Sequence, residues 1–410
     1  MTVIEPFKAI RPTRDKAYLV ATRPSYAYNK EVLHAKLNHN PYTFLHVINP
    51  EFHTDDKTKP NTPERFQKIR NKFVEFINEG IFIREEKESF YLYRQTVDGH
   101  AYVGLIAGAS VDQYNSGHIK KHEETITERE TVFSNYLKIV EFNVEPVLLF
   151  HRKHEALNQL LAPLMFARPE YEFTSWDRGK HEIWIVKTPE TIEKIQNYYK
   201  EIEDIYIADG HHRCASSARY SNSIRNKTSK SQDLFLACFI SEEKLKIFDY
   251  NRLVKDLNGL SSKKFLEGIS KSFIITTVLH EDAAPSGLHE ISMYLEKQWY
   301  KLTAKEGTFD RNHAVHKLDT DILTKNILNP ILDLFDLKTN ERVSFINGKK
   351  GMIGIEDAVE EERAKVGFGL FPVSVTDLKR VSNENLIMPP KSTWIEPKLR
   401  SGLTIFPLDE

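Results

Sequence analysis

The sequence predicts an α/β (α+β) protein in which a central module is flanked by an N-terminal and a C-terminal α+β lobe. Its 410 residues exceed the size of one ordinary compact domain. From residue 110 to residue 241, expected strands and helices alternate, which favours a module with a mixed sheet and helices. The flanking parts mix strands and helices less regularly. We therefore expect three parts, over 1–109, 110–241 and 242–410.

The N-terminal lobe contains one well-marked helix. The first 60 residues are rich in turn signals, and they predict loops, short helices and a strand over 43–48. A helix is predicted after the cap Thr62, with Pro63 in its first turn and an end at Gly80. Its apolar positions are Phe66, Ile69, Phe73 and Ile77. Three consecutive antiparallel strands are expected to follow, over 81–86, 89–97 and 101–110.

The central module alternates its elements in chain order. A loop and a helix are expected over 117–137, then a buried strand over 144–151, a helix over 153–166 and a strand over 181–188. A second helix that starts with Thr-Pro is predicted over 188–202. It is followed by a strand over 204–208, a helix over 213–224 and a strand over 233–241. This order predicts one sheet with helices between its strands.

The C-terminal lobe alternates less regularly. We expect a helix over 263–273 and a hairpin with paired aromatic residues over 290–304. A helix is predicted over 319–335, with Pro330 as a break or kink. Strands are expected over 342–347 and 366–374.

The composition excludes several classes of protein. Lysine plus arginine is 57 and aspartate plus glutamate is 58, and this balance argues against a general binder of nucleic acid or membrane surfaces. A nuclease would need a basic groove that this composition does not indicate. No apolar run reaches the roughly 18–20 residues of a membrane span, and the N-terminus lacks the apolar stretch of a signal peptide. With only Cys214 and Cys238, a cytoplasmic location is expected. The sequence does not indicate an oligomeric state.

The strongest chemical feature is a polar turn after the strand 204–208. Here Gly210 allows a sharp turn and close approach to a ligand, and a helix start offers N–H groups and a positive dipole end. Arg213 can fork two hydrogen bonds to a phosphate, while His211 and His212 can donate to a phosphate or move a proton. Asp209 can hold a metal ion or accept a hydroxyl proton. The group predicts a turn that handles phosphate.

Other interpretations of this turn remain open. Asp-Gly is also an ordinary turn, and Asp209 could simply cap the helix. Zinc could be held by His211, His212 and Cys214, although adjacent histidines project differently and no second ligand cluster is visible.

Two further segments carry candidate residues. In "KHEET", Glu123 can act as a general base beside His122, although a charged helix start has the same composition and the spacing is not that of a zinc protease. In "MPPKSTWIEPKLRSG", prolines stiffen a stretch of hydroxyl and basic side chains that could lie on a phosphate; they are Lys391, Ser392, Thr393, Lys398 and Arg400. The alternative for this segment is a basic surface tail.

These pieces together resemble the family catalogued as domain of unknown function 1015, over nearly the whole chain. The matching pieces, in chain order, are "FKAIRP", "HEET", "EPVLLF", "YIADGHHR", "NRLV" and "MPPKSTWIEPK" with "SGL". The central part also resembles the ParB/sulfiredoxin superfamily, and within it the free serine kinases, which phosphorylate L-serine with ADP, ATP or pyrophosphate. The chain departs from them in the long stretch between its two motifs. At the position of the sulfiredoxin cysteine it has His211, which argues against sulfinic acid reduction.

This resemblance implies a phosphotransferase that acts on free serine or O-phosphoserine, as a kinase or, in reverse, as a phosphatase. Glu123 matches the catalytic glutamate, and the turn from Asp209 to Arg213 matches the part that handles phosphate and Mg²⁺, with Asp209 on the metal. His122 and the hydroxyl and lysine side chains of 391–398 would help to bind substrate and donor phosphates. A nucleotide or pyrophosphate would be the donor. The alternative is a nucleotide-binding regulator that turns over no metabolite.

Overall fold

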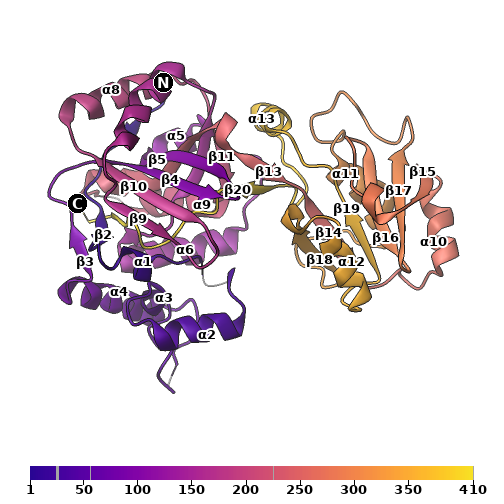
Figure 1. Ribbon diagram of the computed structural model, residues 1–410, viewed down its shortest axis with the longest axis horizontal. Helices are drawn as coiled ribbons and strands as arrows, with labels where there is room; N and C mark the ends of the chain where they lie inside the picture. Colours follow the sequence, from indigo (N-terminus) through magenta and orange to yellow (C-terminus); the bar gives the residue numbers. More distant parts are fainter. Residues whose placement is uncertain (25–26, 56, 225, 410) are drawn as a thin grey trace. The chain divides into compact units, whose positions relative to one another are not determined.

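A mixed sheet forms the centre of the first of two units in the computed structural model, which describes residues 1–24, 27–55, 57–224 and 226–409 (Figure 1). The first unit comprises Met1–Leu245 and Pro397–Glu410, and the second comprises Lys246–Glu396. The expected boundary after residue 241 lies close to the end of the first segment. The expected separation at 109 falls within the first unit, and the return of the chain to this unit at Pro397 was not expected.

The central sheet of the first unit has nine strands among the described residues, in the order β6-β11-β8-β12-β5-β4-β10-β9, with β1 paired to β5. The pairs β6/β11 and β8/β12 are parallel, and the other pairs are antiparallel. The α/β class with a mixed sheet is thus confirmed. The strands are β1 (Ile4–Glu5), β4 (Phe90–Val97), β5 (His100–Ser110), β6 (Ile119–Lys120), β8 (Val147–His151), β9 (Tyr171–Thr174), β10 (Lys180–Val186), β11 (Ile205–Asp209) and β12 (Leu234–Ser241).

Helices and two short ribbons complete this unit. The ribbons pair β2 (Ile10–Pro12) with β3 (Phe82–Arg84), and β7 (Phe142–Asn143) with β21 (Phe406–Pro407). The helices are α1 (Ala17–Val20), α2 (Lys30–His39), α3 (Leu45–Ile48), α4 (Pro63–Asn78), α5 (Val111–Asn115), α6 (Thr127–Val140), α7 (Glu155–Leu161), α8 (Pro189–Lys200) and α9 (His211–Ser223).

The expected helix after Thr62 is confirmed as α4. The Thr62 hydroxyl accepts a hydrogen bond from the backbone N–H of Arg65, as an N-cap residue does. The buried face of this helix consists of Phe66, Ile69, Phe73 and Phe76, whereas Ile77 is only half-buried.

Two expectations for the N-terminal lobe are wrong. Residues 43–48 do not form a strand, because α3 occupies Leu45–Ile48. One helical turn lets Phe44 and Val47 enter the same apolar cluster, whereas a strand would alternate its side chains between two faces. The first strand of the expected antiparallel set is also absent from it, since β3 pairs with β2 rather than with β4.

The central sheet positions the helix α9. Alternate residues of β11, Ile205 and Ile207, lie in an apolar cluster that also contains Tyr199 of α8 and Cys214 of α9. On its other side, α9 packs against α6. The helix that follows the polar turn is therefore held between the sheet and a second helix, and this fixes the position of its first turn.

The second unit is built on a six-stranded antiparallel sheet within the described part of the chain, in the order β15-β17-β16-β19-β14-β18. The expected hairpin over 290–304 is confirmed as β16 and β17. The strands and helices are β13 (Lys246–Phe248), β14 (Tyr250–Val254), β15 (Phe273–Val278), β16 (Glu290–Leu295), β17 (Gln298–Ala304), β18 (Val343–Asn347), β19 (Val366–Gly369), β20 (Trp394–Glu396), α10 (Ser262–Ile269), α11 (Asp319–Leu323), α12 (Ile353–Glu360) and α13 (Val375–Asn383).

The helix expected over 319–335 is shorter than predicted. It consists of α11 and one wider helical turn over Thr324–Leu328, and it stops before Pro330. Proline removes a helical hydrogen bond and clashes with the preceding turn, so the break at this residue is the one that its chemistry favours.

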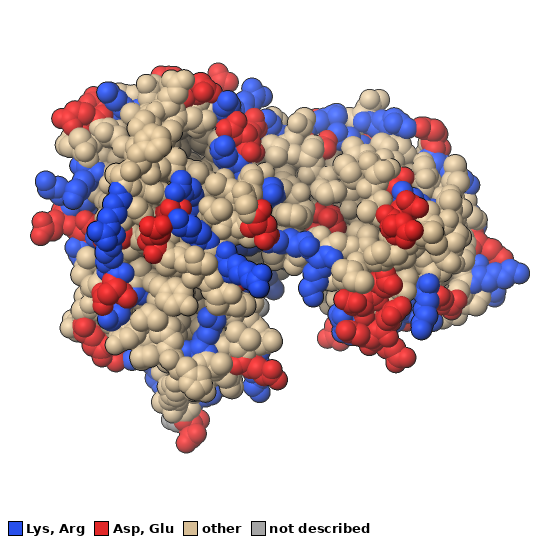
Figure 2. Space-filling model, viewed as in Figure 1, with Lys and Arg blue, Asp and Glu red and all other residues tan. Residues whose placement is uncertain are grey.

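Charges of both signs intermingle on the molecular surface. Lys and Arg side chains are interspersed with Asp and Glu over the face in Figure 2, in keeping with the net charge of −1. Both cysteines, Cys214 and Cys238, are buried and free. In the ranges that the structure describes, no helix combines the length and apolarity that crossing a membrane requires.

Candidate active site

Two parallel neighbouring strands bring the "KHEET" segment to the polar turn. Ile119 of β6 lies opposite Ile205 of β11, and Lys120 lies opposite Tyr206. Because parallel strands end at the same edge of a sheet, the residues that follow β6 and β11 leave the sheet together. His122 and His211, which are 89 positions apart in the chain, meet there.

Gly210 makes the turn between β11 and α9. Its φ angle is +102°, in the left-handed region where glycine is strongly favoured. A Cβ atom at this position would lie only 3.0 Å from Nη2 of Arg213, so the missing side chain also makes room for the guanidinium group. Thus Gly210 sets both the direction of the turn and the place of Arg213.

His211 connects the turn to Glu123. Its side chain is 4% exposed, its Nε2 accepts the backbone N–H of His122 at 3.4 Å, and its Nδ1 lies 3.6 Å from Oε2 of Glu123. A backbone N–H can only donate, so Nε2 carries no proton and Nδ1 directs its hydrogen at the carboxylate. Burial lowers the pKa of His211 to about 3, and the ring is therefore neutral at pH 7.

His122 supports this arrangement from the protein interior. Its side chain is fully buried, and its ring meets that of His211 edge-on, with the centroids 4.4 Å apart. Burial, together with the neighbouring His211, lowers the pKa of His122 to about 3. The expectation that His122 binds substrate does not fit a side chain without exposed surface. Its position fits a residue that holds His211 in place.

Asp209 lies between two positive charges. Its Oδ1 is 3.4 Å from Nζ of Lys398, and its Oδ2 is 3.3 Å from Nη2 of Arg213. Burial by itself raises the pKa of Asp209, but the charges of Lys398 and Arg213 outweigh it and hold that pKa below its usual range. The structure therefore places Lys398 beside the turn, and its part in binding donor phosphates stays a prediction.

Arg213 is anchored by residues that sequence reasoning did not single out. Its Nη1 donates to the backbone carbonyls of Pro146 at 2.7 Å and Glu145 at 3.1 Å, and lies 3.0 Å from Oε1 of Glu145. Burial raises the pKa of Glu145, and Arg213 opposes that rise. The signal for Glu145 was its place in "EPVLLF", one of the pieces of the family resemblance. His212 is half-buried on the same first turn of α9.

Lys391, Ser392 and Thr393 belong to the second unit, and their part in the site stays a prediction. Ser392 is buried, and its hydroxyl donates to the carbonyl of Pro389 at 2.7 Å and contacts the Thr320 hydroxyl at 3.2 Å. Thr393 is buried as well.

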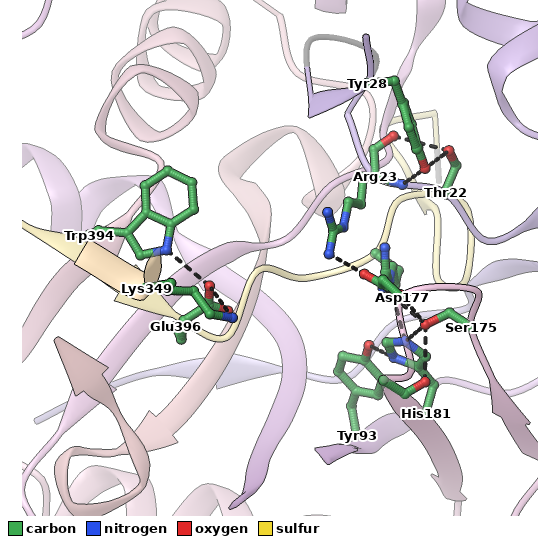
Figure 3. A network of polar contacts seen from close by, with 12 residues as sticks. Thr22, Arg23, Tyr28, Tyr93, Ser175, Asp177, His181, Lys349, Trp394 and Glu396 are labelled. Atoms are coloured by element: carbon green, nitrogen blue, oxygen red, sulfur yellow. Dashed lines mark hydrogen bonds and ion pairs between the residues drawn. The ribbon is translucent and has the colours of Figure 1, made fainter. Parts of the chain in front are cut away.

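The segment that carries these residues is tied down within the second unit. The buried Arg252 donates to the carbonyl groups of Pro390 and Lys391. Further along, Trp394 Nε1 donates to Glu396 Oε1 at 2.9 Å (Figure 3). The stretch is therefore docked and ordered rather than a loose basic tail.

The donor atoms at the turn do not fit a metal ion as they are arranged. Nowhere among the described residues do three His, Cys, Asp or Glu side chains converge as metal ligands. Cys214 is fully buried, and burial raises the pKa of its thiol, which does not favour the thiolate that zinc requires. The two oxygens of Asp209 face Lys398 and Arg213, so this carboxylate as arranged does not fit a divalent cation.

Comparison with known proteins gives one family match. The family model described as "Protein of unknown function (DUF1015)" matches residues 4–321. No curated protein matches the chain.

Similar solved structures are distant. They include a free serine kinase in complex with AMP, with a TM-score of 0.38 and 11% identity over 73% of this chain and 91% of that chain. SbnI with a C-terminal truncation, from Staphylococcus aureus, has a TM-score of 0.41 and 12% identity over 74% and 87% of the two chains. A conserved hypothetical protein from Pyrococcus furiosus has a TM-score of 0.36 and 11% identity over 72% and 90%. At these values the likeness carries no conclusion about activity.

Proposed function

The chain belongs to the family described as "Protein of unknown function (DUF1015)", and we propose that it is a phosphotransferase acting at the hydroxyl of free serine or O-phosphoserine. One observation carries the proposal. The turn that places His211 against Glu123 also places Asp209 between Lys398 and Arg213. The candidate base and the candidate phosphate site therefore lie at the same edge of the sheet.

Glu123 acts as the general base. Its carboxylate is about one-third exposed, and the neutral His211 holds it from the protein side. In the kinase direction, Glu123 takes the proton from the serine hydroxyl while the hydroxyl oxygen attacks the terminal phosphorus of the donor. A new O–P bond forms, the bond from phosphorus to the leaving oxygen breaks, and the shortened donor departs with that electron pair. In the reverse direction, the protonated Glu123 gives its proton to the serine oxygen as the bond between that oxygen and phosphorus breaks. The new bond to phosphorus is formed by the acceptor oxygen, or by a water that passes a proton back to Glu123.

Positive groups at the start of α9 hold the phosphoryl group. Arg213 and Lys398 supply charge, and the first turn of a 13-residue helix adds N–H groups and the positive end of the helix dipole. His212, on that turn, donates a further hydrogen bond. Phosphoryl transfer depends mainly on such positioning and charge neutralisation. Asp209 keeps the two cations in place.

The choice of serine rests on the motifs rather than on a shaped pocket. It comes from the pairing of "HEET" with "DGHHR", which resembles the pattern in free serine kinases. Mg²⁺ enters as the ordinary counterion of a nucleotide or pyrophosphate. The cytoplasmic location likewise stays a prediction.

An assay on the full chain tests the proposal in both directions. Purified protein is incubated with Mg²⁺, serine and ADP, ATP or pyrophosphate, and separately with phosphoserine alone or with ADP. Formation or consumption of phosphoserine supports the proposal and gives its direction. A folded protein that binds nucleotide but turns over neither compound is a nucleotide-binding regulator, and that outcome overturns the proposal.

A further inference from the structure

The first unit contains a cavity of about 420 Å³ that the proposed chemistry does not use. This volume is within the range of small-molecule binding sites. It lies among α1, α2, the end of β9 and the C-terminal segment of the unit. Aromatic rings form much of its wall, and they belong to Tyr18, Tyr28, Tyr42, Phe173 and Trp176. None of its described lining residues is acidic.

The aromatic wall offers a surface for a planar ring. The side chain of Trp176 is 55% exposed, which is unusual for a residue that normally buries its large apolar surface. Lys36 places its ammonium nitrogen 5.4 Å from the Trp176 ring centroid and 5.3 Å from that of Tyr28. The guanidinium carbon of Arg23 lies 5.5 Å from the Trp176 ring centroid. Cations thus gather around an aromatic platform that leaves much of its surface to solvent.

Positively charged side chains are in excess around the cavity. Arg400 donates from Nη2 to both oxygens of Asp177 at 2.6 Å. Arg23 pairs with the same carboxylate, as Figure 3 shows. The ammonium group of Lys36 lies over aromatic rings instead, and burial together with the charge of Arg400 lowers its pKa. Behind Arg400, the buried His181 is neutral at pH 7, because burial lowers its pKa to about 3. Arg23 and Arg400 thus share the carboxylate of Asp177, whereas Lys36 contacts aromatic rings.

We propose that this cavity binds a nucleoside phosphate, with the base on Trp176 and a phosphate near Lys36. The ligand must combine a planar ring with negative charge. Serine and pyrophosphate carry no ring and would leave the aromatic wall unused. The volume accommodates a base with its sugar.

The chain links this cavity to the polar turn. Arg400 lines the cavity, and Lys398, two residues before it, reaches Asp209. Two residues of extended chain span at most about 7 Å, so the two side chains project from nearly the same place. The nucleotide would therefore be the phosphoryl donor. That donor role rests on the proposed function, whereas binding in the cavity does not.

Titration of the full chain with ADP tests the site without any turnover. We expect Trp176→Ala to weaken ADP binding about 5- to 150-fold, the loss typical of one stacked base, and to leave pyrophosphate binding unchanged. Lys36→Gln should weaken ADP more than adenosine. Phe166→Ala serves as the control, because Phe166 is an aromatic residue with 90% exposure that does not line the cavity.

The outcomes separate this proposal from the proposed function. Undiminished ADP affinity in Trp176→Ala, or no ADP binding to the wild-type protein, overturns the nucleotide site even if serine is phosphorylated from pyrophosphate. Selective loss of ADP affinity in Trp176→Ala supports the site, and it does so even if no phosphoserine is ever formed.

Discussion

His211 directs Nδ1 at Oε2 of Glu123, 3.6 Å away, while its other ring nitrogen accepts the backbone N–H of His122. The histidine is buried and neutral, and the glutamate is partly exposed. The pair therefore has the geometry of a base and the residue that orients it, in which only the glutamate can reach a substrate.

His211→Asn should impair the positioning of Glu123 rather than the binding of serine. Asparagine can hydrogen-bond but cannot reach both His122 and Glu123 in the same way, so we expect kcat to fall at least about tenfold while KM for serine changes little. Since His211 is already neutral, the wild-type pH–rate profile should show no inflection near pH 6.5 from this residue. Steady-state kinetics from pH 5 to pH 9 would check both points. A rise in KM with kcat unchanged would instead assign His211 to substrate binding.

Gly210→Ala should disturb the turn in two ways. Alanine is strained at a φ of +102°, and its Cβ would press on the Arg213 guanidinium. We expect a loss of about 1–3 kcal/mol in unfolding free energy, together with a large loss of turnover. Gly117→Ala is the matched control, because its φ is +78° but a Cβ there meets open space. Equal effects of the two substitutions on turnover would rule out a special role for the Gly210 turn.

Arg213→Lys should weaken the affinity for phosphate, although the substitution keeps the positive charge. Lysine cannot reproduce the planar fork that contacts Glu145, Pro146 and Asp209. We expect kcat/KM to fall at least about tenfold, with a weaker affinity for pyrophosphate in calorimetry. The control is Arg219→Lys on the same helix, where the native side chain makes a 3.5 Å contact with Glu130. An unchanged affinity for pyrophosphate would remove Arg213 from the phosphate site.

The buried histidines should make the protein sensitive to acid. In the folded chain the pKa values of His122 and His211 are about 3, below the ordinary 6.5, so the unfolded chain binds more protons between these values. Their contribution to stability is complete above pH 6.5 and declines as the pH falls toward 3. The slope is about 1.4 kcal/mol per pH unit for each histidine.

Urea unfolding at pH 7.5, 6.5 and 5.5 measures this dependence. His122→Phe should flatten it, because an apolar ring of similar size has no proton to take up. His34→Gln, at an exposed histidine, is the control and should leave the slope unchanged. An identical slope in the wild type and in His122→Phe would contradict the burial of a neutral His122.

Capping residues and apolar periodicity correctly predicted elements whose form depends on neighbouring residues in the chain. The helix α4 was predicted from its Thr-Pro start and its apolar period, because caps and periodicity are local properties. Residues 43–48 were wrongly predicted as a strand, since a short apolar run has no period and only its contacts with α4 decide its form.

The candidate site could be predicted only in part. Sequence reasoning selected Glu123, the turn at 209–213 and Lys398, and the structure brings them together across the parallel pair β6/β11. It did not select the Asp177–Arg400 pair, whose members are 223 residues apart, because no motif relates positions that only the fold makes neighbours. The burial of His122 could not be predicted from the sequence either. A histidine beside a glutamate in a polar stretch does not indicate which of the two side chains will be buried against the sheet.

The most direct test is Glu123→Gln, compared with wild type by ³¹P NMR of phosphoserine formed or consumed. Glutamine keeps the shape of the side chain but cannot accept the proton, so turnover should fall by about 10²- to 10⁴-fold. The unfolding free energy should stay within about 0.5 kcal/mol, as is usual for a substitution at a partly exposed position. The neighbouring Glu124→Gln, at an exposed residue, should behave as wild type. If Glu123→Gln turns over phosphoserine at the wild-type rate, or unfolds, the assignment of Glu123 as the base is contradicted.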